Sequence, residues 1–211
     1  MYQPLFREER LEVMHQLMQT YPLATLVTSQ NNGLAADHLP LILHPEMSPN
    51  GTLHGHFSKG NPLWRTPPTS REALLVFQGP QTYVTPSWYP SKQEHGKVVP
   101  TWNYACVHAR GTIEFIEDPK WLLQHLMQLT SAHENHRTTP WKVSDAPTDF
   151  IARQLKGIVG IQLQIESLEG TWKMSQNRPE QDIAGVLEGL QKKPNTTASD
   201  ITELVKSSIK A

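Results

Sequence analysis

Apolar residues recur at helical spacing in a few stretches of the chain and alternate with polar residues in most others. Several stretches place leucine, methionine, isoleucine or valine three and four residues apart among charged neighbours, a spacing that predicts amphipathic helices. The predicted helices cover residues 7–19, 121–133, 150–155, 182–191 and 200–209. Alternation and β-branched residues predict strands over residues 23–29, 35–43, 52–57, 73–78 and 156–165, with two further pieces within 98–116.

Turn signals separate these strands at short intervals. Asn32-Gly33 is a hairpin signal, Pro49-Asn50-Gly51 marks another turn, and we expect Gly79-Pro80 to end the strand before it. About six strands with short connections, helices near the ends and one crossover predict a mainly β (α+β) domain, a small barrel with peripheral helices. We expect this domain to span residues 1–191, and a polar tail that contains the last helical pattern to span 192–211.

Composition and charge narrow the functional classes. The chain has 211 residues, with 19 Lys plus Arg against 20 Asp plus Glu, so no whole-molecule positive field draws it to DNA or to anionic lipid. The single cysteine, Cys106, cannot form an intramolecular disulfide, and no apolar run comes near the roughly 20 residues needed to cross a bilayer. Because residues 1–10 also lack a secretory apolar region, we expect a cytoplasmic protein.

Polar and aromatic residues gather at four predicted strand ends. The first cluster, residues 56–64, turns through Ser58-Lys59-Gly60-Asn61 and offers a cation, a hydroxyl and backbone N–H groups, which are the groups that bind a phosphate. A solvated turn with an incidental lysine explains the same residues equally well. In the second cluster, residues 79–89, prolines keep the stretch out of a central strand. Its aromatic rings and hydroxyls then either line a groove for a flat ligand or cap the core.

The other two clusters also have both a structural and a functional interpretation. In residues 99–108, period-two alternation predicts two faces, and the more aromatic of them suits a core or an interface. That face carries Trp102, Tyr104, Cys106 and His108. Residues 172–179 place two cations and two amides on a loop beyond the last strand, as ligand contacts or as a capped loop before a helix.

Metal and nucleophile sites have weaker support. His54 and His56 share one strand face, and His133 and His136 are three residues apart, but no set of histidines, cysteines and carboxylates has the spacing of a structural zinc site. The local signatures of serine hydrolases, P-loop NTPases, Rossmann enzymes and zincins are absent from the sequence as well. We therefore assign no metal ligand and no catalytic residue.

Six short motifs follow one another along the chain, most of them within these clusters. They are Met1-Tyr2-Gln3-Pro4 with Phe6; Asp37-His38-Leu39-Pro40; residues 56–64 with their Asn61-Pro62-Leu63-Trp64 ending; Gly79-Pro80 with Tyr83 and Pro86-Ser87-Trp88-Tyr89; Val99-Pro100-Thr101-Trp102-Asn103-Tyr104 with Val107-His108 and Gly111; and Lys173-Met174-Ser175-Gln176-Asn177-Arg178. In this order they resemble the motifs of the PaiB family, which is described as a family of FMN-binding negative regulators of transcription. The resemblance extends from residue 1 to about residue 190.

The PaiB family is similar to the split-barrel flavoproteins, the class of the pyridoxamine phosphate oxidases and small flavin reductases. The resemblance therefore implies an FMN-binding split β-barrel with peripheral helices. It implies that the FMN phosphate lies at the strand end and turn of His56, Ser58, Lys59 and Asn61, and that the strand of Asp37 and His38 runs under the isoalloxazine. By the same resemblance, the partner subunit of a homodimer contributes contacts from Trp102, Asn103, Tyr104, Lys173, Gln176 and Arg178. Because Lys59 is the only cation of a turn for which the oxidases have an arginine-rich pattern, we expect weak FMN affinity.

Three functions remain open at this point. The first is an FMN-binding homodimer that lowers transcription, directly or indirectly, although the sequence shows neither the basic stripe nor the helix-turn-helix pair that direct DNA binding favours. The second is an FMN-dependent oxidoreductase or flavin reductase that uses NAD(P)H, because the residues around a flavin need only orient and tune it. The third is a haem-binding split barrel that uses the histidines. We favour the first, with FMN as cofactor, a second copy of the chain as partner, DNA as a further candidate partner, and no membrane.

Overall fold

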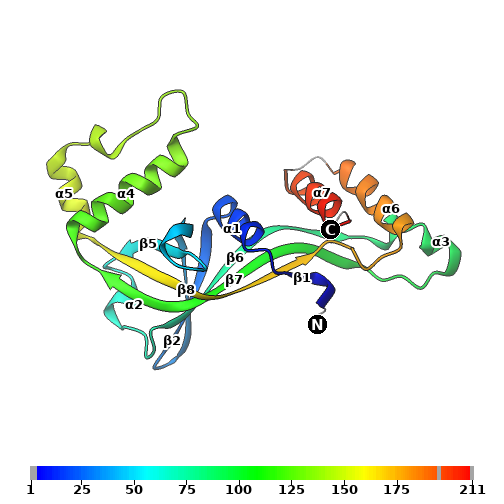
Figure 1. The fold of residues 1–211 in the computed structure, drawn as a ribbon, viewed down its shortest axis with the longest axis horizontal. Coiled ribbons are helices and arrows are strands. Elements are labelled where there is room, and N and C mark those ends of the chain that lie inside the picture. The colour runs from blue at the N-terminus through cyan, green and yellow to red at the C-terminus, as the bar shows by residue number, and fades with distance from the viewer. Residues whose placement is uncertain (1–3, 194–195, 210–211) are drawn as a thin grey trace. The chain divides into compact units, whose positions relative to one another are not determined.

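The computed structural model describes residues 4–193 and 196–209 as long antiparallel strands with helices packed on them (Figure 1). The strands are β1 (Arg7–Glu8), β2 (Leu23–Gln30), β3 (Gly33–Pro40), β4 (Ile42–His44), β5 (Thr52–Ser58), β6 (Glu72–Val84), β7 (Thr101–Ile116) and β8 (Ile158–Lys173). The helices are α1 (Leu11–Thr20), α2 (Pro62–Arg65), α3 (Ser91–His95), α4 (Pro119–Glu134), α5 (Thr148–Lys156), α6 (Glu180–Gln191) and α7 (Thr196–Ile209), with 3-10 turns η1 (Pro4–Phe6), η2 (Pro45–Met47), η3 (Pro86–Trp88) and η4 (Val143–Asp145). None of the described helices combines the length and the apolar character needed to span a membrane.

The strands form one antiparallel sheet. Their order is β3-β2-β6-β7-β8-β5-β4, and β1 pairs separately with β8. The predicted Asn32-Gly33 turn joins β2 to β3, with Gln30 opposite Gly33. β5 runs antiparallel to β8, so that Thr52 lies opposite Gln164 and Ser58 opposite Ile158. This register brings the end of β5, where the sequence predicted a phosphate turn, to the beginning of β8.

The three longest strands extend beyond their predicted limits. β6 continues through Gly79-Pro80, where we expected a strand end, because β2 pairs with it only from Ala73 to Val76 and the missing N–H of Pro80 breaks no hydrogen bond of that ladder. The alternation of buried side chains changes phase at Gly79-Pro80, so this pair marks an irregularity within β6. β7 is one continuous strand where we predicted two pieces, and β8 continues to Lys173 where we predicted an end at residue 165.

Two elements nearer the N-terminus also differ from prediction. Helix α1 begins at Leu11, not at residue 7, because Arg7 and Glu8 pair with β8. The single strand predicted over residues 35–43 is divided into β3 and β4 at Leu41, whose N–H donates a hydrogen bond to the Pro22 carbonyl oxygen. In both places a long-range backbone pairing replaces the local pattern.

The chain divides into two compact units whose boundaries fall within β6, β7 and β8. Unit 1 comprises the described residues among 1–14, 78–107 and 169–211, and unit 2 comprises residues 15–77 and 108–168. Parts of two predicted segments lie outside the described residues. They are residues 1–3 of the first motif and residues 194–195 and 210–211 of the predicted tail. The division into a domain over 1–191 and a tail over 192–211 stays a prediction.

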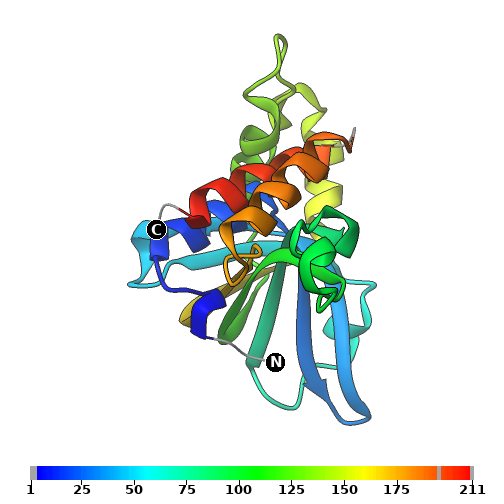
Figure 2. The same ribbon diagram turned by 90° about the vertical axis from the view of Figure 1, so that its right-hand side faces the viewer.

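The core of unit 1 includes the last two helices. α6 and α7 lie side by side (Figure 2), and they bury Val186, Leu190, Ile201 and Val205 almost completely. These residues repeat at helical spacing, which explains why the chain after residue 196 forms a packed helix longer than the one predicted over 200–209. The first unit therefore takes part of its core from residues within the predicted polar tail.

The core of unit 2 is formed mainly by inward-facing residues of the sheet. Leu26, Leu53, Leu75, Ile161 and Leu163 are each at most 1% exposed and come from β2, β5, β6 and β8. α4 packs closely against β8 because Gly160 leaves room for the Trp121 ring: a Cβ built on Gly160 would lie 2.3 Å from its Cζ3 atom. This close approach places the inner face of α4 over β5 and β8 and positions the histidines described below.

We predict that Gly111→Ala destabilises the protein strongly. A Cβ on Gly111 of β7 would lie 2.0 Å from the backbone oxygen of Gln164 in β8, and two paired strands cannot separate at one point without losing hydrogen bonds on either side. The expected loss is about 1–3 kcal/mol of unfolding free energy or more, measured by urea denaturation. Gly157→Ala is the matched control, since its Cβ would meet nothing closer than the Gln154 oxygen at 3.4 Å. Equal stability of the two variants would contradict this packing.

Candidate functional site

The turn after β5 brings together Asp37, Ser58, Lys59 and Asn61, four of the residues predicted to hold FMN. Backbone hydrogen bonds hold the turn: the Lys59 N–H donates to the Gly157 oxygen at 2.8 Å and the Asn61 N–H to the Ser58 oxygen at 2.8 Å. The Ser58 hydroxyl oxygen accepts a hydrogen bond from the Gly60 N–H at 3.1 Å. The turn is therefore compact, and its hydroxyl and one of its amides are bonded to each other.

Asn61 links this turn to β3 and to α2. Its side-chain oxygen accepts a hydrogen bond from the Leu63 N–H at 2.7 Å and so caps α2, which begins at Pro62. Its side-chain nitrogen donates to Asp37 Oδ1 at 2.6 Å. Asn61 thus holds Asp37 beside the turn. The Asp37 carboxylate therefore lies near the site that is predicted to bind the FMN phosphate.

The cation of the turn is already paired. Lys59 Nζ lies 2.5 Å from Glu117 Oε2, just beyond the end of β7, and 5.8 Å from the centroid of the Trp64 ring. Both charged side chains are partly exposed, at 34% for Lys59 and 54% for Glu117. No motif marks Glu117 in the sequence; it reaches Lys59 because β7 and β5 both pair with β8. Any anion that binds here must draw the ammonium group away from Glu117.

The two histidines predicted for this site lie elsewhere. His38 is exposed on β3, opposite Thr25. His56 points toward α4, where its Nδ1 lies 3.1 Å from Nε2 of His125. Two environments therefore meet at the end of β5: the turn of Ser58 and Lys59, and the contact of His56 with α4.

That second environment is a cluster of histidine and tryptophan rings from β4, β5 and α4. The His44 and His54 ring centroids lie 4.3 Å apart, His54 lies 5.0 Å from Trp121, and Trp121 stacks on His125 at 5.3 Å. A cavity of about 340 Å³ adjoins these rings and is also lined by Glu46, Met47, Gln124 and Gln128. Among the described residues, no three His, Cys, Asp or Glu side chains stand together in an arrangement that could hold a metal ion.

Burial favours the neutral form of three imidazoles, those of His54, His56 and His125. Desolvation lowers the pKa of His54 to about 4, repulsion from His44 adds to this, and a side-chain hydrogen bond with Gln162 opposes it. Desolvation also lowers the pKa of His125 to about 3, with further repulsion from neighbouring histidines, and it lowers the pKa of His56. At neutral pH these three rings therefore each carry one N–H and one lone pair.

Asn103, Lys173 and Gln176 come together in unit 1, around the loop after β8. Lys173 Nζ donates to the Thr101 hydroxyl oxygen at 2.6 Å, and the Ser175 hydroxyl donates to Asn103 Oδ1 at 3.0 Å. Asn103 is fully buried, and its Nδ2 has no hydrogen-bond partner among the described residues. Ser175 has φ 65°, a left-handed conformation that is costly for a residue with a side chain and that often occurs at functional sites.

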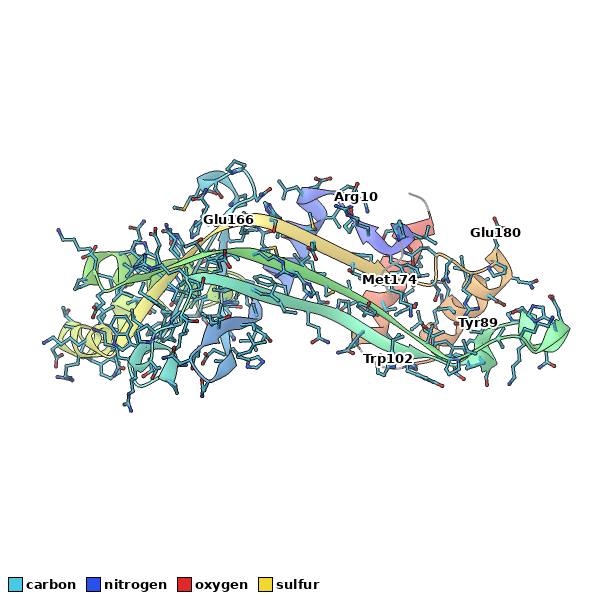
Figure 3. All side chains as sticks on the ribbon, turned by 90° about the horizontal axis from the view of Figure 1, so that it is seen from below. Arg10, Tyr89, Trp102, Glu166, Met174 and Glu180 are labelled. Carbon is cyan, nitrogen blue, oxygen red and sulfur yellow. The ribbon has the colours of Figure 1, made fainter. Side chains whose placement is uncertain are left out.

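Gln176 and Arg178 have structural partners in the same loop. Gln176 Oε1 accepts from the Met174 N–H at 2.6 Å, and its Nε2 donates to the Trp172 oxygen at 2.6 Å. The Arg178 guanidinium lies 4.8 Å from the centroid of the Tyr89 ring, which Figure 3 marks together with Met174. These contacts fix the shape of the loop.

Trp102 and Tyr104 lie on the opposite face of β7 from Asn103. The buried face of this strand is the one that carries Asn103, Ala105 and Val107, each 0% exposed. Trp102, marked in Figure 3, is 51% exposed, and its ring centroid lies 6.2 Å from that of Tyr83, which is 44% exposed. Of the two interpretations left open for the aromatic face, the structure excludes a core within one chain.

Cys106 lies on this same face and is only partly exposed. Burial raises the pKa of its thiol, while a side-chain hydrogen bond with Thr171 opposes the rise. A raised pKa reduces the thiolate fraction at neutral pH. This environment does not favour a nucleophilic role for Cys106.

A second cavity contains a cation that the sequence analysis did not select. It has a volume of about 470 Å³, and Arg110 contributes its only lysine or arginine, alongside the carboxylates Glu72 and Glu166. Thr28, whose hydroxyl is buried without a hydrogen-bond partner among the described residues, lines it as well. Arg110 stands between Val107-His108 and Gly111 of the fifth motif but was not among the predicted site residues; its place on β7, beside the close approach of Gly111 to β8, brings it to this cavity.

Comparison with known proteins identifies the family. The sequence pattern of the family described as "Putative FMN-binding domain" matches residues 1–167. The chain belongs to this family. The matched range of the FMN-binding domain includes the turn of Ser58 and Lys59 and the residues of β7, whereas the loop of Lys173 to Arg178 lies beyond it.

A full-length relative confirms the resemblance to PaiB. The chain is 34% identical to "Protease synthase and sporulation protein PAI 2" of Bacillus subtilis, over 100% of this chain and 99% of that protein. It is also 32% identical to "Uncharacterized protein AN0679" of Emericella nidulans, over 94% of this chain and 93% of that protein. Relatives that match nearly the whole chain therefore occur in a bacterium and in a fungus.

Solved structures confirm the predicted fold. A "FAD and Heme binding protein" from Mycobacterium smegmatis superposes with a TM-score of 0.59 at 19% identity, covering 84% of this chain and 78% of that one. "Flavocytochrome Anf3" from Azotobacter vinelandii gives a TM-score of 0.57 at 13% identity, covering 85% and 75% of the two chains. The FMN-binding domain thus has the predicted split-barrel fold, an antiparallel sheet with peripheral helices.

Proposed function

We propose that this protein binds FMN as a homodimer and that its flavin-bound state lowers transcription, by contact with DNA or by an indirect route. The observation that carries the proposal is the family match over residues 1–167, which contains the turn of Ser58, Lys59 and Asn61. The transcriptional part rests on the resemblance to PaiB. The flavin, when bound, supplies the capacity to accept and donate electrons, and the protein's own residues bind and orient it.

The turn after β5 supports phosphate binding if two internal contacts open together. Lys59 must leave Glu117, and the Ser58 hydroxyl must rotate away from the Gly60 N–H. These changes release an ammonium group, a hydroxyl and a backbone N–H at one point, the combination that binds a phosphate. The displaced Glu117 carboxylate and the nearby Asp37 repel the same anion, which supports the expectation of weak affinity.

The exposed aromatic face of unit 1 supports the homodimer. Trp102 and Tyr83 are both about half exposed and contact each other edge to face, next to the partly exposed Tyr104. Exposed aromatic clusters on a sheet mark interaction surfaces, and a two-fold axis lets one surface cover its own copy. A second copy would bring its Trp102 and Tyr104 to a flavin held in the first, as the family resemblance implies.

The near-neutral charge of the chain supports an indirect route to transcription more than direct DNA binding. The net charge is −1, and several lysines and arginines are paired with carboxylates, for example Arg153 with Asp149 and Lys192 with Glu188. Affinity for DNA comes largely from lysines and arginines that contact phosphates, and paired, dispersed cations provide few such contacts.

Lys59→Ala and Glu117→Gln should change FMN affinity in opposite directions. The first removes the cation that contacts the phosphate, and we expect the FMN dissociation constant to rise at least severalfold. The second frees Lys59, and we expect the constant to fall. Flavin fluorescence titration measures both, and riboflavin, which has no phosphate, is the control ligand whose affinity should not change. If Lys59→Ala binds FMN as the wild type does, the phosphate does not lie at this turn.

Trp102→Glu should convert the dimer to a monomer. A carboxylate placed in the centre of an apolar interface loses its hydration without gaining a partner, which costs several kcal/mol of association free energy. Sedimentation velocity measures the mass of the particle. Trp141→Glu is the matched control, because Trp141 is also about half exposed, at 48%, but lies on the loop after α4. A wild-type monomer, or a Trp102→Glu dimer, is incompatible with the proposed interface.

A regulatory role predicts that NADH and NADPH do not reduce the bound flavin rapidly. We expect the flavin absorbance of the anaerobic, FMN-loaded protein to persist for many minutes with excess nicotinamide, while dithionite bleaches it at once. Bleaching within the time of a typical enzyme turnover, about 0.1 s, would instead assign the protein as an FMN-dependent oxidoreductase.

A further inference from the structure

The cavity at Arg110 lies on five neighbouring strands of the sheet. Its lining residues come from β3, β2, β6, β7 and β8, which follow one another in that order across the sheet. All of them belong to unit 2. A site whose walls are paired strands holds its side chains more precisely than a site on loops. The volume of about 470 Å³ lies within the range of small-molecule sites.

Three charged side chains line this cavity without forming an ion pair. Arg110 lies on β7, and the two strands beside β7 contribute Glu72 from β6 and Glu166 from β8, which Figure 3 marks. All three side chains are exposed. Among the described residues, the two carboxylates receive one hydrogen bond, from the Thr112 hydroxyl to Glu166 Oε1 at 2.9 Å, and the Arg110 guanidinium has no partner. The charges therefore remain available to a ligand.

The arrangement of these charges selects the class of ligand. A guanidinium group binds a carboxylate through two parallel hydrogen bonds, so Arg110 attracts a carboxylate. A simple anion at Arg110 is repelled by Glu72 and Glu166, and a simple cation at the glutamates is repelled by Arg110. A ligand that carries both charges pairs with all three groups.

We propose that this cavity binds a free α-amino acid with an apolar side chain. Its carboxylate pairs with Arg110, and its ammonium group pairs with the flanking carboxylates of Glu72 and Glu166. The two charged groups of an α-amino acid are attached to the same carbon atom, so they reach side chains of neighbouring strands, which lie about 5 Å apart.

The uncharged lining of the cavity suits an apolar side chain. Val27 of β2, Leu34 of β3 and Leu74 of β6 border it on the side of β2 and β3. Leu34 is 79% exposed, so a ligand packed on it removes apolar surface from water. The lining shares no residue with the turn of Ser58 and Lys59, so the proposal does not depend on FMN binding.

Isothermal titration calorimetry with L-leucine tests the site. We expect the wild type to bind about one L-leucine per chain, with or without FMN. N-acetyl-L-leucine keeps the carboxylate but has no ammonium group, and L-leucinamide keeps the ammonium group but has no carboxylate. Each should bind at least severalfold more weakly than L-leucine, because each leaves part of the charged lining unpaired.

Two variants test which side chain pairs with which end of the ligand. Arg110→Gln should bind L-leucine at least severalfold more weakly and L-leucinamide more tightly, because it removes both an attraction and a repulsion. Glu72→Gln combined with Glu166→Gln should also weaken L-leucine binding, but should strengthen the binding of N-acetyl-L-leucine. A merely structural effect of either change would weaken all three ligands alike.

Arg153→Gln is the matched control, because it removes an exposed arginine from α5 and should bind L-leucine as the wild type does. The substituted side chains of the test variants are exposed, so we expect all variants to have the urea midpoint of the wild type. No heat of binding from millimolar L-leucine, or equal binding of L-leucine by Arg110→Gln, overturns the proposal. So does equal affinity of the wild type for L-leucine and either analogue, or the loss of L-leucine binding when FMN saturates the protein.

Discussion

Lys59 lies directly after β5 with its ammonium group on the Glu117 carboxylate, and this ion pair controls whether the turn can hold a phosphate. The pair is partly exposed, so water weakens it, and its contribution to folding stability is small. That weakness is useful for a binding site: the lysine is positioned by Glu117 and by the Trp64 ring, yet a dianionic phosphate can compete for it. The same exchange also limits affinity, because part of the energy gained at Lys59 is spent in separating the original pair.

The position of that turn follows from the sheet. Pairing of β5 with β8 from Thr52 to Ser58 fixes the turn beside Gly157, whose carbonyl oxygen accepts the Lys59 N–H. Glu117 directly follows the end of β7, so the position of β7 places its carboxylate beside Lys59. A change in any of these strands would move the ion pair, so the site depends on long-range pairing more than on its own few residues.

Much of the fold could be predicted from local patterns. The alternation over residues 52–57, the Asn32-Gly33 turn and the helical spacing over 121–133 each specify an element that the structure contains, because burial on one face imposes a period on the sequence. The errors occur where distant pairing overrides a local signal. Pro80 normally ends a central strand, but β2 stops pairing with β6 at Val76, so the proline is tolerated and the strand continues. The burial of Ile201 and Val205 within α7 is likewise not apparent from the polar composition after residue 196.

The candidate site was less predictable for the same reason. The cluster of Ser58, Lys59 and Asn61 is contiguous in the sequence, so it could be recognised, and Asp37 came with the family resemblance. Glu117 could not, because nothing local marks a carboxylate that neutralises a lysine 58 positions away in the chain. The partner of His56 was equally hidden, since His125 is 69 positions away. Period-two alternation correctly separated Asn103 from Trp102 but could not say which of the two faces is buried.

The central claim is that the chain binds FMN at this turn, and a difference-absorbance titration of the protein with FMN tests it most directly. The account predicts a saturable shift of the flavin bands with a stoichiometry of about one FMN per chain, and a weaker response to riboflavin because the phosphate contact is missing. Flavin bands that stay unchanged at every FMN concentration, or an equal response to riboflavin and FMN, would contradict it.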